Sequence, residues 1–354
     1  MFLPTPEMGP VNTFFKKIFI LSWSGVDLFF VLSGFLIGGI LLDNRSAKNY
    51  YYTFYFRRIC RIMPLYFVLI IPFILVYLSN AWQNMPVLGW IFNSPLPLWS
   101  YATFTQNFFV INDGSFGANG LGVTWSLAIE EQFYLILPFL IRFVSKARLP
   151  YVFISLIIAA PLFRTILLFI YPTGAFAGFV LLPGRMDALF FGVLGAWILR
   201  QDNIRSLLTR NLRFIFAAMF LSGLIIPFIT YLYSKPGAPA AMVLMTIGFT
   251  CMSAFFLCLI LVSILGNNRT ISRVLSIKPL RGLGIVSYFV YLFHLVFLGL
   301  GHAFILNQKP QNTDLTKSMV TLFSLVLLLS FAVLSWFIFE RPFIKYSHRV
   351  DYEK

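Results

Sequence analysis

Apolar segments about 20 residues long recur along the whole chain, separated by short polar stretches rich in arginine and lysine. A membrane-spanning helix needs roughly 20 predominantly apolar residues. The segments that meet this requirement are 18–42, 62–81, 122–144, 150–171, 174–199, 212–233, 239–265, 283–306 and 318–339. The segment 86–110 is also apolar, but Pro86, Pro95 and Pro97 interrupt it, so we expect a re-entrant or interfacial stretch there. The pattern predicts an all-α fold, a polytopic transmembrane helical bundle of about nine spans.

The composition supports this prediction. Of the 354 residues, 59% are hydrophobic and only 11% are charged. A soluble domain carries roughly 25% charged residues, so the composition argues against a water-soluble core. We predict one membrane domain over residues 18–345, preceded by a short segment, 1–17, and followed by a cytoplasmic tail, 346–354.

The net charge of +15 reflects topology and does not indicate a nucleic-acid partner. Most lysines and arginines follow the first, third, fifth, seventh and ninth spans. The alternate loops and the N-terminal segment contain only Lys16, Lys17, Lys235, Lys309 and Lys317. Cytoplasmic loops carry the excess of cations in membrane proteins. We therefore predict a multi-pass protein of the plasma (inner) membrane with a cytoplasmic C-terminus and membrane lipids as partners.

The predicted topology leaves the N-terminus outside. Residues 1–17 contain Lys16 and Lys17 and show no signal-peptide cleavage pattern. One further helix before the first span would restore a cytoplasmic start. The chain also has only three cysteines, which fall at or within the apolar segments, and we expect neither a disulfide framework nor a metal site.

Several charged or titratable residues lie in or near the apolar segments. A charge at the bilayer centre costs about 2.5–3.5 kcal/mol, so each of these residues needs a structural or functional reason. They are Asp27, Glu130, Glu131, Arg164, Arg185, Asp187 and His294. Asp27 lies near the outer end of the first span, where it could cap a neighbouring helix or take part directly in the chemistry.

Two adjacent glutamates interrupt the apolar helix TWSLAIEEQFYLILP (124–138). Ser126 and Tyr134 are four residues from Glu130 on either side and share its face, whereas Glu131 points about 100° away. Burial would suit either glutamate to general acid or base catalysis. The alternative is that they are structural ion-pair partners of Arg164 or Arg185.

Two later segments contain further candidates. Arg185 follows Pro183, which can break the helix, and it could pair with one of the two glutamates or bind an anion. Ser287, Tyr291 and His294 form a polar stripe on one helix face. His294 is either a buried core residue or a general base, the commonest role of histidine in catalysis.

Three arginines lie within five residues in RRICRIMP (57–64). Arg58 and Arg61 share a face, and Pro64 would open the following span. Arginine is well suited to bidentate phosphate contacts. The cluster therefore indicates a cytoplasmic anionic ligand.

Six motifs along the chain resemble those of the membrane-bound acyltransferase-3 family. They occur in the family's order over residues 24–345: GVDLFFVLSGFLI, RRICRIMP, TWSLAIEEQFYLILP, GRMDALFFG, SYFVYLFHLVF and FERPF. The resemblance implies transfer of an acyl group, usually acetyl, from acyl-CoA to a hydroxyl of a cell-envelope carbohydrate or lipid-linked sugar. It also implies that Arg58 and Arg61 handle the acyl-CoA donor, and it matches the family's glutamate pair to Glu130 and Glu131 and its late histidine to His294.

The resemblance also implies ten spans in the intact family pattern, the first of which ends in an important histidine. No such helix precedes the GVDLFF segment in this sequence, and His294 is the first histidine. We expect a chain without that helix to have little transferase activity unless His294 or Glu130 is the base. Arg185 is our candidate for stabilising the oxyanion, because preorganised donors stabilise the charge that develops in acyl transfer. The alternatives are a transporter of a polar metabolite or sugar, and an inactive truncated relative.

The predicted topology can be tested by cysteine-accessibility labelling. A cysteine at Asn112, within the outer segment 82–121, should be labelled only from outside, and one at Tyr352 only from the cytoplasm, because Lys354 is predicted to be cytoplasmic. Labelling of both positions from the same side would refute the predicted arrangement.

Overall fold

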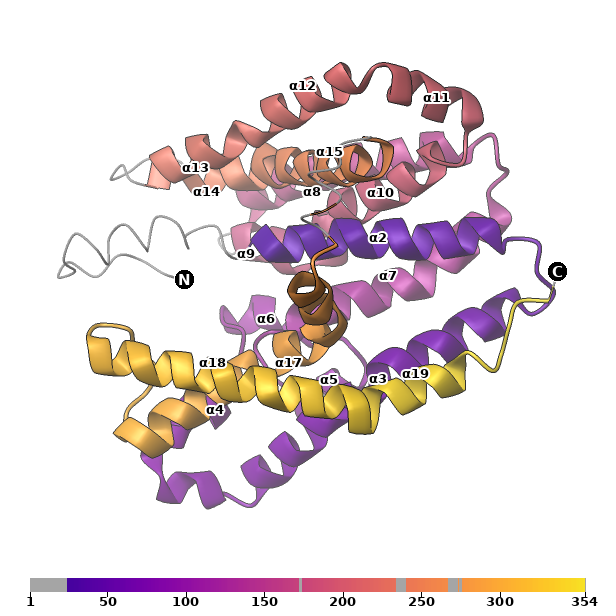
Figure 1. Cartoon of the computed structure of the whole chain (residues 1–354). Helices are drawn as coiled ribbons and strands as arrows, with labels where there is room; N and C mark the ends of the chain where they lie inside the picture. The colour runs from indigo at the N-terminus through magenta and orange to yellow at the C-terminus, as the bar shows by residue number, and fades with distance from the viewer. Residues whose placement is uncertain (1–23, 172–173, 234–239, 267–272, 274–275, 354) are drawn as a thin grey trace. The chain divides into compact units, whose positions relative to one another are not determined.

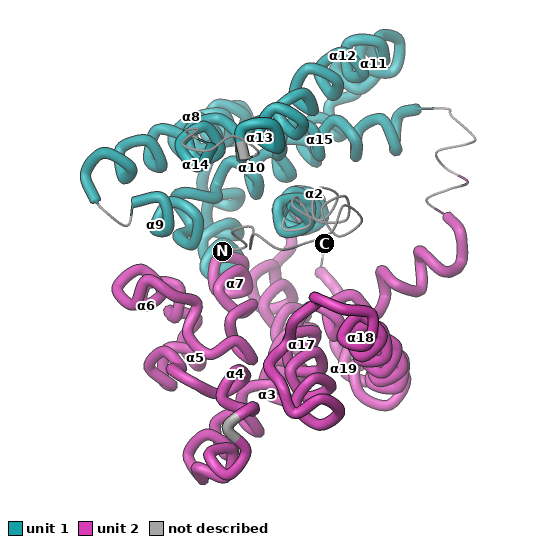
Figure 2. The backbone as a smooth tube through the Cα atoms, turned by 90° about the vertical axis from the view of Figure 1, so that its left-hand side faces the viewer, with its two compact units in different colours: residues 1–43, 132–269 teal, residues 44–131, 270–354 magenta. Residues whose placement is uncertain are grey.

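The computed structural model describes residues 24–171, 174–233, 240–266, 273 and 276–353. Within these residues the chain is helical and has no strand. The predicted segment 1–17 and the start of the span 18–42 lie outside the described residues. Figure 1 shows the labelled helices, and Figure 2 shows the two compact units into which the chain divides. Unit 1 comprises Met1–Asp43 and Gln132–Arg269, and unit 2 comprises Asn44–Glu131 and Thr270–Lys354.

Each unit is built from helices that are distant in sequence. The helices of unit 1 are α2 (Gly25–Asp43), the C-terminal part of α7 (Thr124–Phe143), α8 (Leu149–Ile170), α9 (Gly174–Val180), α10 (Leu182–Ile198), α11 (Asp202–Arg210), α12 (Leu212–Gly223), α13 (Ile225–Tyr233), α14 (Ala240–Val243), η4 (Leu244–Gly248) and α15 (Phe249–Leu265). The helices of unit 2 are α3 (Tyr50–Leu78), η2 (Ala81–Asn84), η3 (Pro86–Leu88), α4 (Gly89–Phe92), α5 (Leu98–Ala102), α6 (Gln106–Asp113), the N-terminal part of α7, α17 (Lys278–Leu306), α18 (Leu315–Ser335), η5 (Trp336–Glu340) and α19 (Arg341–Ser347).

Eight helices of the described residues are long and apolar enough to cross a membrane, so the chain is a multi-pass helical membrane protein. They are Gly25–Asp43, Tyr50–Leu78, Leu149–Ile170, Gly174–Ile198, Leu212–Leu232, Ala240–Leu265, Lys278–Leu306 and Leu315–Ser347. The remaining predicted span, 122–144, forms the 20-residue helix α7 but is not among the eight. Three adjacent polar residues, Glu130, Glu131 and Gln132, reduce its mean hydropathy.

Two expected interruptions are confirmed. The proline-rich segment 86–110 contains only short helices, η3, α4, α5 and the start of α6. The predicted break near Pro183 is also present, because Leu181 is extended and α10 starts at Leu182. Arg185 therefore lies in the first turn of α10.

The prediction that Pro64 opens a span is wrong. A single helix, α3, runs from Tyr50 to Leu78, with Pro64 and Pro72 in its interior. Prolines are tolerated within membrane helices because neighbouring groups satisfy the backbone groups that they free. The arginines of RRICRIMP consequently belong to the same rigid helix as the apolar span that follows.

The C-terminal tail is bound to the start of α3 within unit 2. Arg57 forms an ion pair of 2.5 Å with Asp351, and its Nε donates to the carbonyl of Val350 over 3.0 Å. The Asn49 side chain donates to the carbonyl of Asp351 and accepts from the backbone N–H of Glu353, both over 2.9 Å. Residues 350–353 thus contact α3 at two places, at Asn49 before its first residue and at Arg57, which precedes Arg58.

Helices α2 and α10 of unit 1 are packed backbone against backbone. A Cβ atom at Gly34 would overlap the carbonyl oxygen of Leu189, and one at Gly192 would overlap that of Val31. Small residues allow membrane helices to approach this closely. These two glycines therefore serve helix packing.

We predict that Gly34→Ala destabilises the protein by about 1–3 kcal/mol, the usual effect of overpacking. Gly25→Ala, at the start of the same helix, is the matched control because a Cβ there has no atom within 4 Å. Thermal unfolding in detergent, followed by size-exclusion chromatography, measures the difference. Equal unfolding midpoints for the two variants would contradict the close packing of α2 against α10.

Candidate functional site

Unit 2 places the two predicted donor-binding arginines beside two carboxylates. Arg58 of α3 is close enough to Glu131 of α7 for their charges to interact, and Arg61 interacts in the same way with Glu340 of η5. Arg58 is half-buried and Arg61 is exposed. The shared helix face predicted for the two arginines therefore becomes a polar surface at which Arg61 is open to a ligand.

Two tyrosines attach α17 to the helices that carry these charges. The hydroxyl of Tyr288 donates to the carbonyl of Ile62 in α3 over 3.0 Å. The hydroxyl of Tyr291 donates to the carbonyl of Val123 over 3.0 Å and also contacts the hydroxyl of Ser126 in α7. Both tyrosines interact electrostatically with the glutamates of α7. The sequence stretch around His294 is thereby fixed against α3 and α7.

His294 lies one turn beyond Tyr291 in the same helix. Its Nδ1 is 2.8 Å from the carbonyl oxygen of Tyr291. A carbonyl oxygen can only accept, so this hydrogen bond requires the proton on Nδ1. In neutral His294 the other nitrogen, Nε2, then carries the lone pair. That tautomer is the one that a general base acting through Nε2 requires.

Ser287, the first residue of the predicted polar stripe, is exposed and donates to the carbonyl of Gly284 in its own helix over 2.9 Å. Sequence reasoning missed Tyr288 and Glu340. The glutamate of the FERPF motif (339–343), directly after an apolar segment, was the available signal for Glu340.

The C-terminal tail also reaches this part of unit 2. The Arg57 guanidinium lies over the ring of Tyr352, 5.4 Å from its centroid. Burial raises the pKa of the Tyr352 hydroxyl, and the positive charges of Arg57 and Arg58 oppose that rise. Tyr352 therefore lies close to Arg58 as well as to Arg57.

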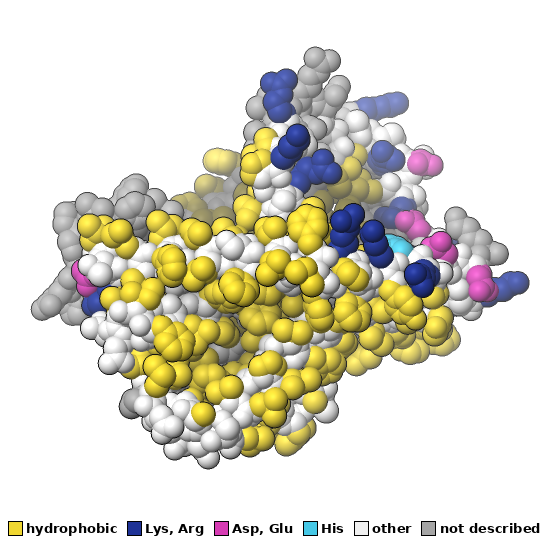
Figure 3. All heavy atoms as spheres, turned by 60° about the horizontal axis from the view of Figure 1, so that its bottom comes forward, with side chains coloured by type: hydrophobic (Ala, Val, Ile, Leu, Met, Phe, Trp, Pro, Cys, Tyr) yellow, Lys and Arg dark blue, Asp and Glu magenta, His cyan; other side chains and the backbone are white. Residues whose placement is uncertain are grey.

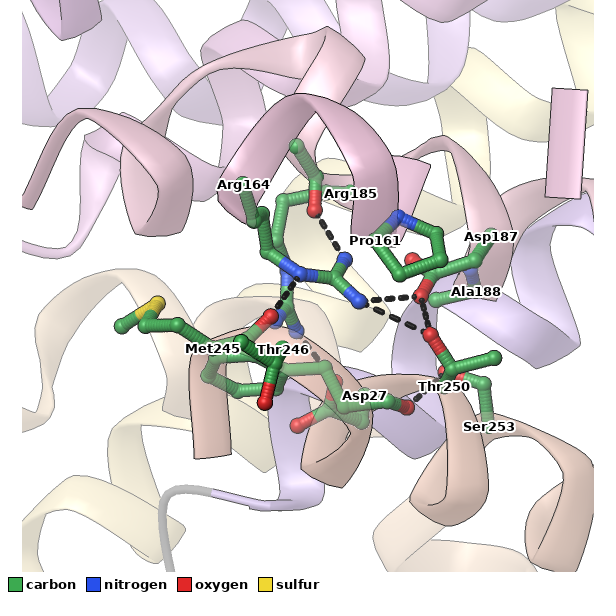
Figure 4. A network of polar contacts seen from close by, with 12 residues as sticks. Asp27, Pro161, Arg164, Arg185, Asp187, Ala188, Met245, Thr246, Thr250 and Ser253 are labelled. Carbon is green, nitrogen blue, oxygen red and sulfur yellow. Dashed lines mark hydrogen bonds and ion pairs between the residues drawn. The ribbon is translucent and has the colours of Figure 1, made fainter. Parts of the chain in front are cut away.

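Unit 1 contains a separate, fully buried network of four charged side chains (Figure 4). Arg164 of α8 forms an ion pair of 2.8 Å with Asp187 of α10 and donates to the carbonyl of Met245 over 2.6 Å. The hydroxyl of Thr250 donates to Asp187 over 2.6 Å.

Arg185 of α10 pairs with Asp27 of α2 within the same network. The Arg185 guanidinium lies 3.9 Å from the ring centroid of Phe249. Nε and Nη1 of Arg185 have no hydrogen-bond partner among the described residues. The stacked ring instead provides a favourable cation–π contact.

These pairs differ from those considered from the sequence. Both buried arginines, Arg164 and Arg185, pair with aspartates of unit 1. Asp27 is fully buried, so it is not an interfacial cap. Tyr134 of α7 lies in unit 1, where its hydroxyl is 2.7 Å from that of Ser33.

Within the described ranges, no three His, Cys, Asp or Glu side chains are close enough together to hold a metal ion. The polar groups of unit 2 are cationic guanidiniums, carboxylates, phenols and an imidazole. This set can bind an anion and move a proton.

The fold is that of a multi-pass helical membrane protein, and His294 lies within one of the helices long and apolar enough to cross a membrane. The chain belongs to the acyltransferase-3 family, whose acyltransferase domain matches residues 3–340.

Two relatives show how far the similarity extends. The peptidoglycan O-acetyltransferase OatA of Listeria monocytogenes is 27% identical over 290 residues, which cover 77% of this chain and 45% of the relative. The O-acetyltransferase OatA of Staphylococcus aureus is 35% identical over 126 residues, which cover 34% of this chain and 20% of the relative. The chain thus spans less than half the length of these relatives. No solved structure matches it.

The Asp27–Arg185 pair gives a stability prediction. Asp27→Leu leaves a buried guanidinium without its counter-charge, which should destabilise the protein by about 3–5 kcal/mol. The double variant Asp27→Leu/Arg185→Met should recover most of that loss, because neither charge remains. The yield of monodisperse protein after heating measures both effects.

A single variant as stable as the wild type would contradict a structural role for the pair. A double variant that is folded but inactive would instead support the oxyanion role predicted for Arg185 from the sequence.

Proposed function

We propose that the protein is a membrane O-acyltransferase that moves an acyl group, usually acetyl, from acyl-CoA to a hydroxyl of a cell-envelope carbohydrate or lipid-linked sugar. The observation that carries this proposal is the set of groups that unit 2 contains. Arg58 and Arg61 supply positive charge, and His294 has the tautomer of a base.

We assign Arg58 and Arg61 to the phosphates of the acyl-CoA donor. Each arginine interacts with one carboxylate, Glu131 or Glu340, which orients it before the donor arrives. The guanidinium fork suits a phosphate, and Arg61 is exposed to receive one. Glu131 and Glu340 are therefore positioning residues for the donor site.

We assign the removal of the acceptor's proton to Nε2 of His294. The acceptor oxygen then forms a bond to the acyl carbon as the carbon–sulfur bond of the thioester breaks. The proton passes from His294 to the departing thiolate, so that a hydroxyl and a thioester become an ester and a thiol. Glu130, which is buried and interacts with Tyr291, is the second candidate for the base.

The acceptor is proposed from the relatives. Two of them are named for O-acetyl transfer, and the name of the Listeria protein specifies peptidoglycan. A sugar hydroxyl is a weak acid that requires a base at the moment of attack, which agrees with the role given to His294. We propose a structural role for Arg185, because its buried pairing with Asp27 joins α10 to α2.

The donor assignment is tested by Arg58→Gln/Arg61→Gln. This double variant should bind acetyl-CoA at least about tenfold more weakly, because each charged hydrogen bond contributes roughly 1.5–3 kcal/mol. Arg57→Gln is the matched control, since Arg57 lies in the same helix turn but pairs with Asp351. Binding to detergent-solubilised full chain is measured by calorimetry.

His294→Gln is the contrasting variant, which should keep donor affinity and lose turnover with a carbohydrate acceptor. Unchanged acetyl-CoA affinity in the double arginine variant would disprove the donor site. Full turnover in His294→Gln would transfer the base role to Glu130.

A further inference from the structure

A surface pocket of unit 2 lies outside the groups assigned above. It is lined by Phe337 and by five residues of α19 or its C-terminal end, with a volume of about 480 Å³. The five are Arg341, Pro342, Lys345, Tyr346 and Arg349. The space-filling view shows lysine and arginine side chains gathered at one end of a largely hydrophobic face (Figure 3).

The lining of this pocket is strongly cationic. Arg341, Lys345 and Arg349 recur every four residues, and no acidic side chain lines the pocket. Within the described residues, none of the three forms an ion pair, whereas Arg57, Arg164, Arg185 and Arg200 all pair with aspartates. Three uncompensated cations around one hollow favour an anionic ligand.

The pocket is continuous with a lipid-facing apolar surface. Phe337 is 59% exposed, and its neighbours Leu334 and Ile338 are 52% and 68% exposed. In a membrane helix such side chains contact acyl chains. A molecule that occupies the pocket therefore meets cations at one end and hydrocarbon at the other, which is the chemistry of an anionic phospholipid.

The π-helical turn η5 explains why these cations face outward. It ends at Glu340, which is buried, accepts from the hydroxyl of Ser335 over 3.1 Å and interacts with Arg61. Arg341 follows directly and is exposed. Because a π turn contains one extra residue, it changes the direction of the side chains that follow. The side chain of Glu340 is consequently buried in unit 2, whereas the basic side chains of α19 lie at the surface.

We propose that this pocket binds the phosphate headgroup of an anionic phospholipid whose acyl chains lie along the exposed residues Leu334, Phe337 and Ile338. Basic residues beside the cytoplasmic end of a membrane helix attract anionic lipids, and the sequence places α19 on that side. The ring of Tyr346, over which the Arg349 guanidinium lies 5.5 Å from the centroid, closes one wall of the site.

The test compares lipid binding by the full chain in detergent, measured by native mass spectrometry with phosphatidylglycerol and phosphatidylcholine as probes. The wild type should retain phosphatidylglycerol in preference to phosphatidylcholine. In Arg341→Gln/Lys345→Gln/Arg349→Gln the preference should fall, by about fivefold for each charge removed. The control Arg205→Gln/Arg210→Gln/Arg213→Gln removes three exposed arginines from α11 and α12 and should keep the preference.

Equal losses in the two triple variants would overturn the proposal, because non-specific charge would then explain the binding. An unchanged preference in the α19 variant would also overturn it. A third contrary result is a fall in acetyl-CoA affinity without any change in lipid preference, which would assign the pocket to the soluble donor. Because donor affinity is measured separately, this test is independent of the proposed transferase reaction.

Discussion

The structure of unit 1 depends on ion pairs between arginines and aspartates that are buried away from water. Two arginines and two aspartates are fully buried there, and each would cost several kcal/mol if it were left alone. Their pairing links α2 to α10 and α8 to α10, while the carbonyl of Met245 and the hydroxyl of Thr250 bring in η4 and α15. Five helical elements therefore meet at one electrically neutral centre, and the surrounding apolar packing is organised around it.

Unit 2 uses its polar groups differently. Arg58 and Arg61 interact with the carboxylates of Glu131 and Glu340, and both arginines are at least partly exposed. Tyr288 and Tyr291 use their hydroxyls to fix α17, and the bond from His294 to the carbonyl of Tyr291 leaves one imidazole nitrogen for proton transfer. Burial of charge stabilises unit 1, whereas accessible charge makes unit 2 the better candidate for the reaction of an acyltransferase.

Much of the helical fold could be predicted from the sequence. Hydropathy located the helices, Pro183 predicted the break before Arg185, and the spacing of Arg58 and Arg61 predicted their common face.

The partners of the buried arginines could not be predicted, because Asp27 and Arg185 are 158 residues apart and meet only through helix packing. The predicted start of α3 was also wrong. A proline usually marks a helix boundary, but Pro64 lies inside α3, because the surroundings of a membrane helix tolerate an internal proline. Glu340 was missed because its inward direction depends on the π turn.

The contact between α2 and α10 has a mechanical consequence. At Gly34 and Gly192 the two backbones meet with no room for even a methyl group. Helices joined at this distance cannot slide past each other without a steric clash, and the Asp27–Arg185 pair fastens them further. They must therefore move as one rigid body. Any rearrangement of helices within unit 1 would have to occur elsewhere, for example at the extended residue Leu181 between α9 and α10.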